Sequence, residues 1–135
     1  MIRRYTNPEM GRIWTEERRY ESWLAVELAA ADAMAAAGIV PVEAARELRA
    51  KAAFDIARIE EIEKTTQHDV IAFTTSVAEH VGPSARWLHC GLTSSDVVDT
   101  AQALQIVEAT DLILRLLADL RVAVRARAEE HRRTP

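Results

Sequence analysis

The sequence predicts an all-α protein, and three observations support this prediction. Apolar residues (Ala, Val, Ile, Leu, Met, Phe, Trp, Tyr and Cys) make up 49% of the 135 residues, whereas Phe, Trp and Tyr make up only 5%. Glycine and proline, which disfavour helix interiors, occur four times each. Apolar residues also recur at helical spacing along most of the chain, so nearly all of it is expected to be helical.

Two helices are expected in the first 38 residues. Asn7 can cap a short helix, because Pro8 behind it fits the first helical position. Thr15 is expected to cap the first long helix, since two glutamates follow it and suit its positive N-terminal end. Trp23 belongs to a broad apolar face of this helix, and Gly38 is expected to end it.

Two shorter helices are expected next. Val40-Pro41 is a start signal for a helix that reaches about Lys51. Asp55 is expected to cap another, in which isoleucines recur every third residue. The stretch from Thr65 to Asp69 is polar and lacks a helical pattern, so we expect it to be irregular.

A further helix is expected from Asp69 to Val81, where Gly82-Pro83 ends it. Val70 and Phe73 lie on its apolar stripe. Residues 84–92 are too few and too irregular for another helix, and they are expected to form a loop.

The last predicted helix is unusually long. Ser94 or Ser95 is expected to cap it, with Asp96 in its first turn, and no glycine or proline follows until Pro135. It would span about 36 residues, or about 55 Å at about 1.5 Å per residue. Two adjacent apolar stripes run along it, one made of Ala103, Val107, Leu114, Leu117 and Val124, the other of Val98, Ile106, Ala109, Ile113, Leu116 and Leu120.

A helix that is apolar on most sides should be buried on most sides. The preceding helices cannot cover its length, so we expect it to pack against helices from downstream sequence or from other subunits. We therefore expect an N-terminal helical domain at residues 1–93 and the truncated start of a long-helix bundle at residues 94–135. The isolated chain is expected to associate or to dissolve poorly, because its apolar stripes lack cover.

Composition argues against several classes of function. The charges are interspersed and sum to −4, so no basic patch for nucleic acid is expected. The single cysteine excludes an intramolecular disulfide and fits a reducing compartment. The sequence contains neither a Cys-His metal pattern nor an apolar run of membrane-spanning length. We therefore expect a cytoplasmic protein without a metal, a cofactor or a membrane partner.

The first group of polar candidates stands before the helix that begins at Asp69. In one interpretation Asp69 merely caps the helix and His68 is exposed. In the other, His68 lies in a cleft at a helix N-terminus, where it could bind an anion or move a proton. Gln67 beside it offers a donor and an acceptor. The spacing alone leaves both interpretations open.

The second group lies at the start of the long helix. A Gly91-Leu-Thr93-Ser94-Ser95 turn presents backbone N–H groups, hydroxyls and the positive helix end, which together suit a phosphate or a carboxylate. The alternative is simple capping by one of the serines. His89 is either a second anion ligand or a packed side chain. Arg4 and Tyr5 are either a solvated tail or a phosphate clamp.

Two separated motifs, Thr65-Thr66-Gln67-His68-Asp69-Val70 and His89-Cys90-Gly91-Leu92-Thr93-Ser94-Ser95-Asp96, are similar to motifs of one family. The chain resembles the N-terminal part of adenylosuccinate lyases of the short bacterial type. The wider group is the fumarase/aspartase superfamily, whose members eliminate fumarate from a substituted succinate. The resemblance covers the whole chain, including Arg4-Tyr5 and Phe54-Asp55-Ile56.

The resemblance implies a homotetramer built around a bundle of long helices, with each active site drawn from three subunits. It also implies an activity, because members of the adenylosuccinate lyase family cleave adenylosuccinate to AMP and fumarate. They also cleave the succinyl-carboxamide ribotide of purine biosynthesis. By motif match, the expected substrate-binding residues are Arg4, Tyr5, Gln67, His68, Asp69, His89, Thr93 and Ser94. Among them, Arg4 is the natural partner for phosphate, and Thr93 with Ser94 would hold carboxylate or phosphate oxygens.

The resemblance places the principal acid, a histidine, and the base, a serine on a mobile loop, in motifs that this chain does not contain. His68 is therefore expected to assist at most by charge or hydrogen bonding. Two alternatives are a sibling lyase of the argininosuccinate or carboxymuconate type and a helical interaction module without catalysis. Arg4-Tyr5 and Gln67-His68-Asp69 favour the purine enzyme, of which this chain would be an inactive fragment.

Overall fold

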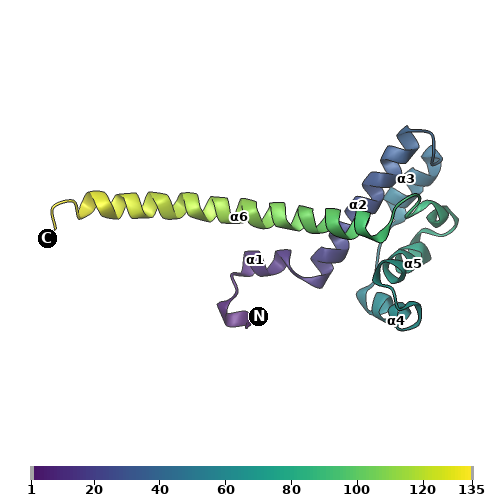
Figure 1. The fold of residues 1–135 in the computed structure, drawn as a ribbon, viewed down its shortest axis with the longest axis horizontal. Coiled ribbons are helices and arrows are strands. Elements are labelled where there is room, and N and C mark those ends of the chain that lie inside the picture. Colours follow the sequence, from purple (N-terminus) through teal and green to yellow (C-terminus); the bar gives the residue numbers. More distant parts are fainter. Residues whose placement is uncertain (1, 135) are drawn as a thin grey trace.

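A computed structural model describes residues 2–134, which fold into six α-helices and two short 3₁₀ segments without a strand (Figure 1). The helices are, in chain order, α1 (Pro8–Ile13), α2 (Glu16–Ala36), α3 (Val42–Lys51), α4 (Ile56–Thr66), α5 (Asp69–Val81) and α6 (Ser94–Glu130). The 3₁₀ segments are η1 (Arg3–Tyr5) and η2 (Pro83–Trp87). The predicted all-α class is therefore confirmed.

The molecule consists of a compact group of helices at one end of a long rod (Figure 1). The rod is α6, with 37 residues and a length of about 55 Å. Helices α2, α3, α4 and α5 gather at the end where α6 begins, α1 lies along its middle, and its C-terminal part extends alone (Figure 1). Helix α2 packs against α6 and α3, and α4 packs against α5.

Three predicted helix starts are confirmed. The Asn7 side chain accepts hydrogen bonds from the backbone N–H groups of Glu9 and Met10, at 2.9 and 3.2 Å. Thr15 caps α2 through Oγ1, and Asp55 caps α4 by accepting from the N–H of the third residue beyond it, at 2.8 Å. Each cap satisfies backbone donors that have no partner inside the helix.

Three details of the expected elements were wrong. Helix α4 continues to Thr66, into the stretch expected to be irregular. His68 rather than Asp69 is the N-cap of α5, since its Nδ1 accepts from the N–H of Ile71 at 3.4 Å. The expected loop at residues 84–92 begins with most of η2, because the chain after Gly82 closes tight turns there.

The cap of α6 was also predicted wrongly. Thr93, and neither Ser94 nor Ser95, is the N-cap. The reason is Asp96, whose carboxylate lies three residues on and accepts from the Thr93 N–H at 2.8 Å, completing a capping box. Helix α6 thus begins at residue 94, slightly earlier than a serine cap implied, while the division into two domains there stays a prediction.

An aromatic cluster forms the centre of the core. The rings of Tyr20 and Phe73 stack with centroids 5.6 Å apart, and Trp23 meets both edge-on, at 5.3 and 5.5 Å. Phe54 packs beside them. These contacts join α2 to α5, and Val97 brings the first turns of α6 into the same core. The core therefore fixes the starts of α5 and α6 relative to α2.

Polar contacts also attach α1 and α2 to the first half of α6. The amide of Gln105 donates to the Ile13 carbonyl at 2.7 Å in a buried position. Arg18 pairs with Glu108 at 2.9 Å, and this hydrogen bond raises the pKa of Arg18. The cover of α6 ends just beyond these contacts, at Leu112, which packs against Ile13.

The second half of α6 is exposed. After Leu112, no residue of this helix within the described range is buried. The uncovered apolar side chains on α6 are Leu104, Ile106, Val107, Ile113, Leu114, Leu116, Leu117, Leu120, Val122 and Val124. The prediction that the preceding helices cannot cover the long helix is confirmed. Even so, no helix between residues 2 and 134 has the length and apolar character needed to cross a membrane.

Candidate functional site

The two sequence motifs meet at the starts of α5 and α6. Nε2 of His68 lies 3.4 Å from Oγ of Ser94, although the two residues are 26 positions apart. Both side chains stand at the N-terminus of a helix, where free N–H groups and the helix dipole favour negative charge. The arrangement therefore suits a ligand with anionic groups.

Hydrogen bonding indicates which ring nitrogen of a neutral His68 carries the proton. Nδ1 accepts from the Ile71 N–H, so a neutral ring carries its proton on Nε2, toward Ser94. The His68 side chain is 44% exposed, which leaves it accessible to a ligand. Asp69 sits beside it, 3.5 Å from Nδ1, and also accepts from the Val70 N–H at 2.7 Å.

A cavity of about 420 Å³ reaches the start of α5 at Asp69, although neither His68 nor Ser94 is part of its lining. Its lining comes from the start of α2, the start of α5 and one face of α6: Trp14, Thr15, Glu16, Arg19, Trp23, Asp69, Val98, Gln102 and Gln105. Val98 and Gln102 follow Ser94 by four and eight residues, so they continue its face of α6. Of the expected site residues, only Asp69 is part of this lining.

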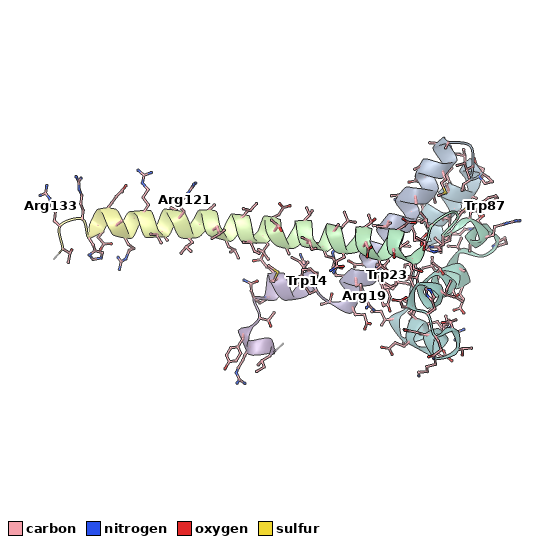
Figure 2. The ribbon with its side chains drawn as sticks, in the orientation of Figure 1. Trp14, Arg19, Trp23, Trp87, Arg121 and Arg133 are labelled. Atoms are coloured by element: carbon pink, nitrogen blue, oxygen red, sulfur yellow. The ribbon has the colours of Figure 1, made fainter. Side chains whose placement is uncertain are left out.

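Arg19 supplies a positive charge to the cavity. Its guanidinium lies over the rings of Tyr20 and Trp23, at 4.7 and 5.4 Å, and pairs with Glu16 at 3.0 Å. Burial raises the pKa of Tyr20, while the nearby Arg19 charge opposes that rise. Figure 2 shows Trp14, Arg19 and Trp23 on the side of α6 where α1 and α2 lie. No motif or spacing in the sequence indicated that Arg19 would line this cavity.

Thr93 and Ser94 are placed differently, although they are neighbours. Thr93 is exposed and forms the capping box with Asp96. Ser94 is half-buried and faces His68. The preceding Gly91 has φ +70°, a conformation that glycine adopts without strain, and a side chain there would contact Met34. The turn into α6 is thus fixed by Gly91, Thr93 and Asp96.

His89 has a partner that the sequence did not predict. Its backbone N–H donates to Oε2 of Glu27 at 2.8 Å, and its Nδ1 lies 2.6 Å from Oε1. Glu27 is only 1% exposed. The signal in the sequence was a carboxylate on the apolar face of α2, between Trp23 and Ala31 at four-residue spacing, both of which are buried.

Gln67 ends α4 in the structure. It adopts a left-handed conformation with φ 51°, and its side-chain amide donates to the Lys64 carbonyl at 3.0 Å. It lines a shallow depression with Glu60, Glu63 and Lys64 rather than the cavity that Asp69 lines. Its binding role stays a prediction.

Arg4 and Tyr5 lie in η1, and the Arg4 guanidinium is 4.8 Å from the centroid of the Tyr5 ring. Both side chains are exposed. The N-terminal segment lies beyond α1, away from the starts of α5 and α6 (Figure 1). Within one chain, these two residues are therefore not brought to His68 and Ser94. The side chain of Arg3 lies outside the described structure.

No group of three or more His, Cys, Asp or Glu side chains within residues 2–134 is arranged to hold a metal ion. Cys90 is a free, half-buried thiol. The chemistry available at the site is therefore that of imidazole, hydroxyl, carboxylate and helix N-termini.

Fold and site together define an all-α protein with a long helix whose apolar face is partly uncovered, and with helix starts that suit anions. Residues 3–135 match the model of a protein family described as lyases, and the chain belongs to this lyase family. The chain is 53% identical over 134 residues to an adenylosuccinate lyase from Synechocystis sp., and 47% identical to one from Bacillus subtilis. The predicted family resemblance is thus confirmed.

The chain corresponds to only part of each relative. Each alignment covers 99% of this chain but only 31% of the relative, so the chain spans about a third of the length of the curated relatives it matches, at their N-terminal part. A crystal structure of a fumarate lyase from Mesorhizobium sp. BNC1 superimposes with a TM-score of 0.87 at 28% identity. That match covers 93% of this chain and 30% of the solved one.

Proposed function

We propose that the protein containing this chain is an adenylosuccinate lyase, a C–N lyase. It would eliminate fumarate from adenylosuccinate to give AMP, and from the succinyl-carboxamide ribotide in purine biosynthesis. The observation that carries this proposal is 53% identity to an adenylosuccinate lyase across 99% of the chain. The contact between His68 and Ser94 supports it, because the two motifs that carry the resemblance then contribute to a single site.

The proposed reaction needs a base, an acid and stabilisation of negative charge. The base removes a proton next to a carboxylate, and the doubly charged intermediate requires hydrogen-bond donors before the purine nitrogen leaves with a proton. His68 Nε2–H, the Ser94 hydroxyl and the two helix N-termini are donors of the required kind. Thr93 and Asp69 would line the same site. The principal acid and base would come from segments that this chain lacks.

The nucleotide end of the substrate would be held by Arg4 and Tyr5, with the Arg4 guanidinium on the phosphate. Because one chain does not bring this pair to His68, the proposal requires a site shared between subunits. The uncovered apolar side chains of α6 support an assembly in which long helices pack together, and we propose a homotetramer. Residues 94–135 would then belong to the bundle domain and residues 1–93 to the N-terminal domain.

The proposed enzyme would act in the cytoplasm without a cofactor. A second candidate is a sibling lyase that releases fumarate from a different leaving group. The likeness to a fumarate lyase structure, with a TM-score of 0.87, favours keeping this candidate. A sibling lyase would have the same scaffold but different residues around the leaving group.

Turnover by the intact gene product separates these candidates. Adenylosuccinate would be followed by the absorbance change as AMP and fumarate form, with argininosuccinate as the competing substrate. We expect cleavage of adenylosuccinate. A folded protein that leaves adenylosuccinate intact would contradict the proposed function, and cleavage of argininosuccinate would favour the second candidate.

A further inference from the structure

Glu27 is a buried acid that the proposed mechanism does not use. Its side chain lies on α2 within the core and is 0% exposed. Burying a carboxylate is costly unless hydrogen bonds stabilise it. Both hydrogen bonds that the described part of the chain gives to Glu27 come from His89, one from the backbone N–H and one from the ring. The two residues, 62 positions apart, therefore form a single unit.

The backbone of His89 is held in an unusual conformation. Its φ is +59°, in the left-handed region that residues other than glycine rarely adopt. The Glu27 carboxylate stabilises that conformation by accepting the His89 N–H at 2.8 Å. Strained backbone of this kind persists where the surroundings over-determine it, and it clusters at functional sites. His89 lies only four residues before Thr93.

The geometry also fixes the His89 ring. An ionised carboxylate only accepts hydrogen bonds, so Nδ1, at 2.6 Å from Oε1, must carry a proton. Nε2 is then the only ring nitrogen left for a ligand, and 19% of the side chain remains exposed. When the ring carries both protons, the Glu27 carboxylate balances its positive charge, and Nε2–H can donate to an anionic oxygen.

We propose that Glu27 is a positioning residue of the substrate site, acting through His89. It holds the His89 backbone and orients the ring, so that Nε2 faces a carboxylate or phosphate oxygen of the substrate and donates to it when the ring carries both protons. The role in substrate binding rests on the proposed function, whereas the hydrogen-bond arrangement of the ring does not.

The variant Glu27→Gln tests this arrangement with little change in shape. The glutamine oxygen must accept the His89 N–H, which leaves its NH₂ group facing Nδ1. Nδ1 then becomes an acceptor, and the ring is neutral with its proton on Nε2. In the intact enzyme we expect KM to rise about tenfold, because a charge-assisted hydrogen bond becomes a neutral one, while kcat stays within about twofold.

A double-mutant cycle distinguishes positioning from general support of the fold. In the His89→Ala background, Glu27→Gln should have no further effect on KM, since Glu27 acts only through His89. The matched control is Glu47→Gln, because Glu47 bonds Ser84 in the same connection at 2.5 Å without contacting His89. Its KM should not change. A rise in KM that persists without the His89 ring would overturn the proposal.

Solid-state NMR of histidine labelled with ¹⁵N gives a readout that does not depend on turnover. The His89 signal is assigned by its loss in His89→Ala. We expect Nδ1 to be protonated in the unaltered protein and unprotonated in Glu27→Gln. An unprotonated Nδ1 in the unaltered protein would overturn the proposal even if Glu27→Gln does not fold. Absence of adenylosuccinate cleavage, by contrast, would contradict only the proposed function and leave this measurement to decide.

Discussion

The two halves of α6 carry the same apolar pattern but differ in burial. In the first half, Val97, Ala101 and Ala109 are buried against α1, α2 and the core. In the second half, Leu117 and Leu120 are about as apolar and remain 53% and 57% exposed. The difference lies in their neighbours, because burial by α1 ends at Leu112, and beyond it α1 contributes the exposed ion pair of Glu9 with Arg115.

Apolar periodicity along α6 therefore predicts a buried face but does not identify what buries it. The first half of α6 has its partners within 93 residues of the same chain. The second half would find them in further helices of the proposed tetramer. The candidate site is divided in the same way, between contacts within one chain and contacts that need another subunit. One chain brings His68 and Ser94 together, but it does not bring Arg4 and Tyr5 to them.

The largest effect is expected in the core that covers the first half of α6, on loss of its central side chain. Phe73→Ala removes a fully buried ring that contacts Tyr20 and Trp23. We expect it to lower the free energy of unfolding by about 3–5 kcal/mol, measured by urea denaturation. The control Ile71→Ala, at an exposed position of the same helix, should cost about 0.5 kcal/mol or less. Equal effects would contradict the described core.

His68 should matter for turnover rather than for stability. Its side chain is exposed and donates toward Ser94, so His68→Ala in the intact enzyme should reduce kcat by about 10²–10³-fold, the usual effect of losing one such donor. The assembly should stay intact by light scattering. His80→Ala, at the other end of α5, is the control. Near-normal turnover in His68→Ala would remove this residue from the site.

The exposed half of α6 should control association of the isolated chain. We expect the 135-residue chain to self-associate, and Leu114→Lys with Leu117→Lys to shift its mass by light scattering toward the 15.1 kDa monomer. Thr110→Lys adds charge at an exposed polar position of the same helix and should not have this effect. A monomeric unaltered chain would show that the apolar face needs no cover.

The smallest effect is expected from an exposed ion pair. Hydrogen bonds from Arg58, the shortest at 2.7 Å, lower the pKa of Glu79 below its ordinary value. The pair therefore stabilises the fold above the ordinary carboxyl pKa, and this stabilisation is lost as pH falls through the lowered pKa. Because both side chains are exposed, the effect is small. In thermal melts, Glu79→Gln should differ from the unaltered protein at pH 7 and converge with it at low pH, whereas divergence there would contradict this sign.

The helix boundaries were largely predictable because their signals are local. Asn7, Thr15 and Asp55 cap the helices they precede, and Gly38 follows the end of α2 with φ +75°. The cap of α6 was missed because three hydroxyl residues stand in a row. The choice among them depends on Asp96 reaching back to the Thr93 N–H.

The candidate site was predictable only in part, because tertiary contacts assemble it. The resemblance indicated His68 and Ser94, but spacing alone did not place them 3.4 Å apart. The partnership of Glu27 with His89 joins residues that are 62 positions apart, and only the carboxylate on an apolar helix face hinted at it. The use of Gln67 to end α4 depends on a left-handed backbone that the sequence did not indicate.

The central claim is that the substrate site combines Arg4 of one subunit with His68 of another, and subunit complementation tests it most directly. Arg4→Ala and His68→Ala versions of the intact enzyme, each weakly active, would be mixed, dissociated, reassembled and assayed with adenylosuccinate. Random mixing should restore about a quarter of the unaltered activity, because some sites receive both native residues from different subunits. If the mixture stays as inactive as its components while the tetramer reforms, the two residues do not serve a site shared between subunits.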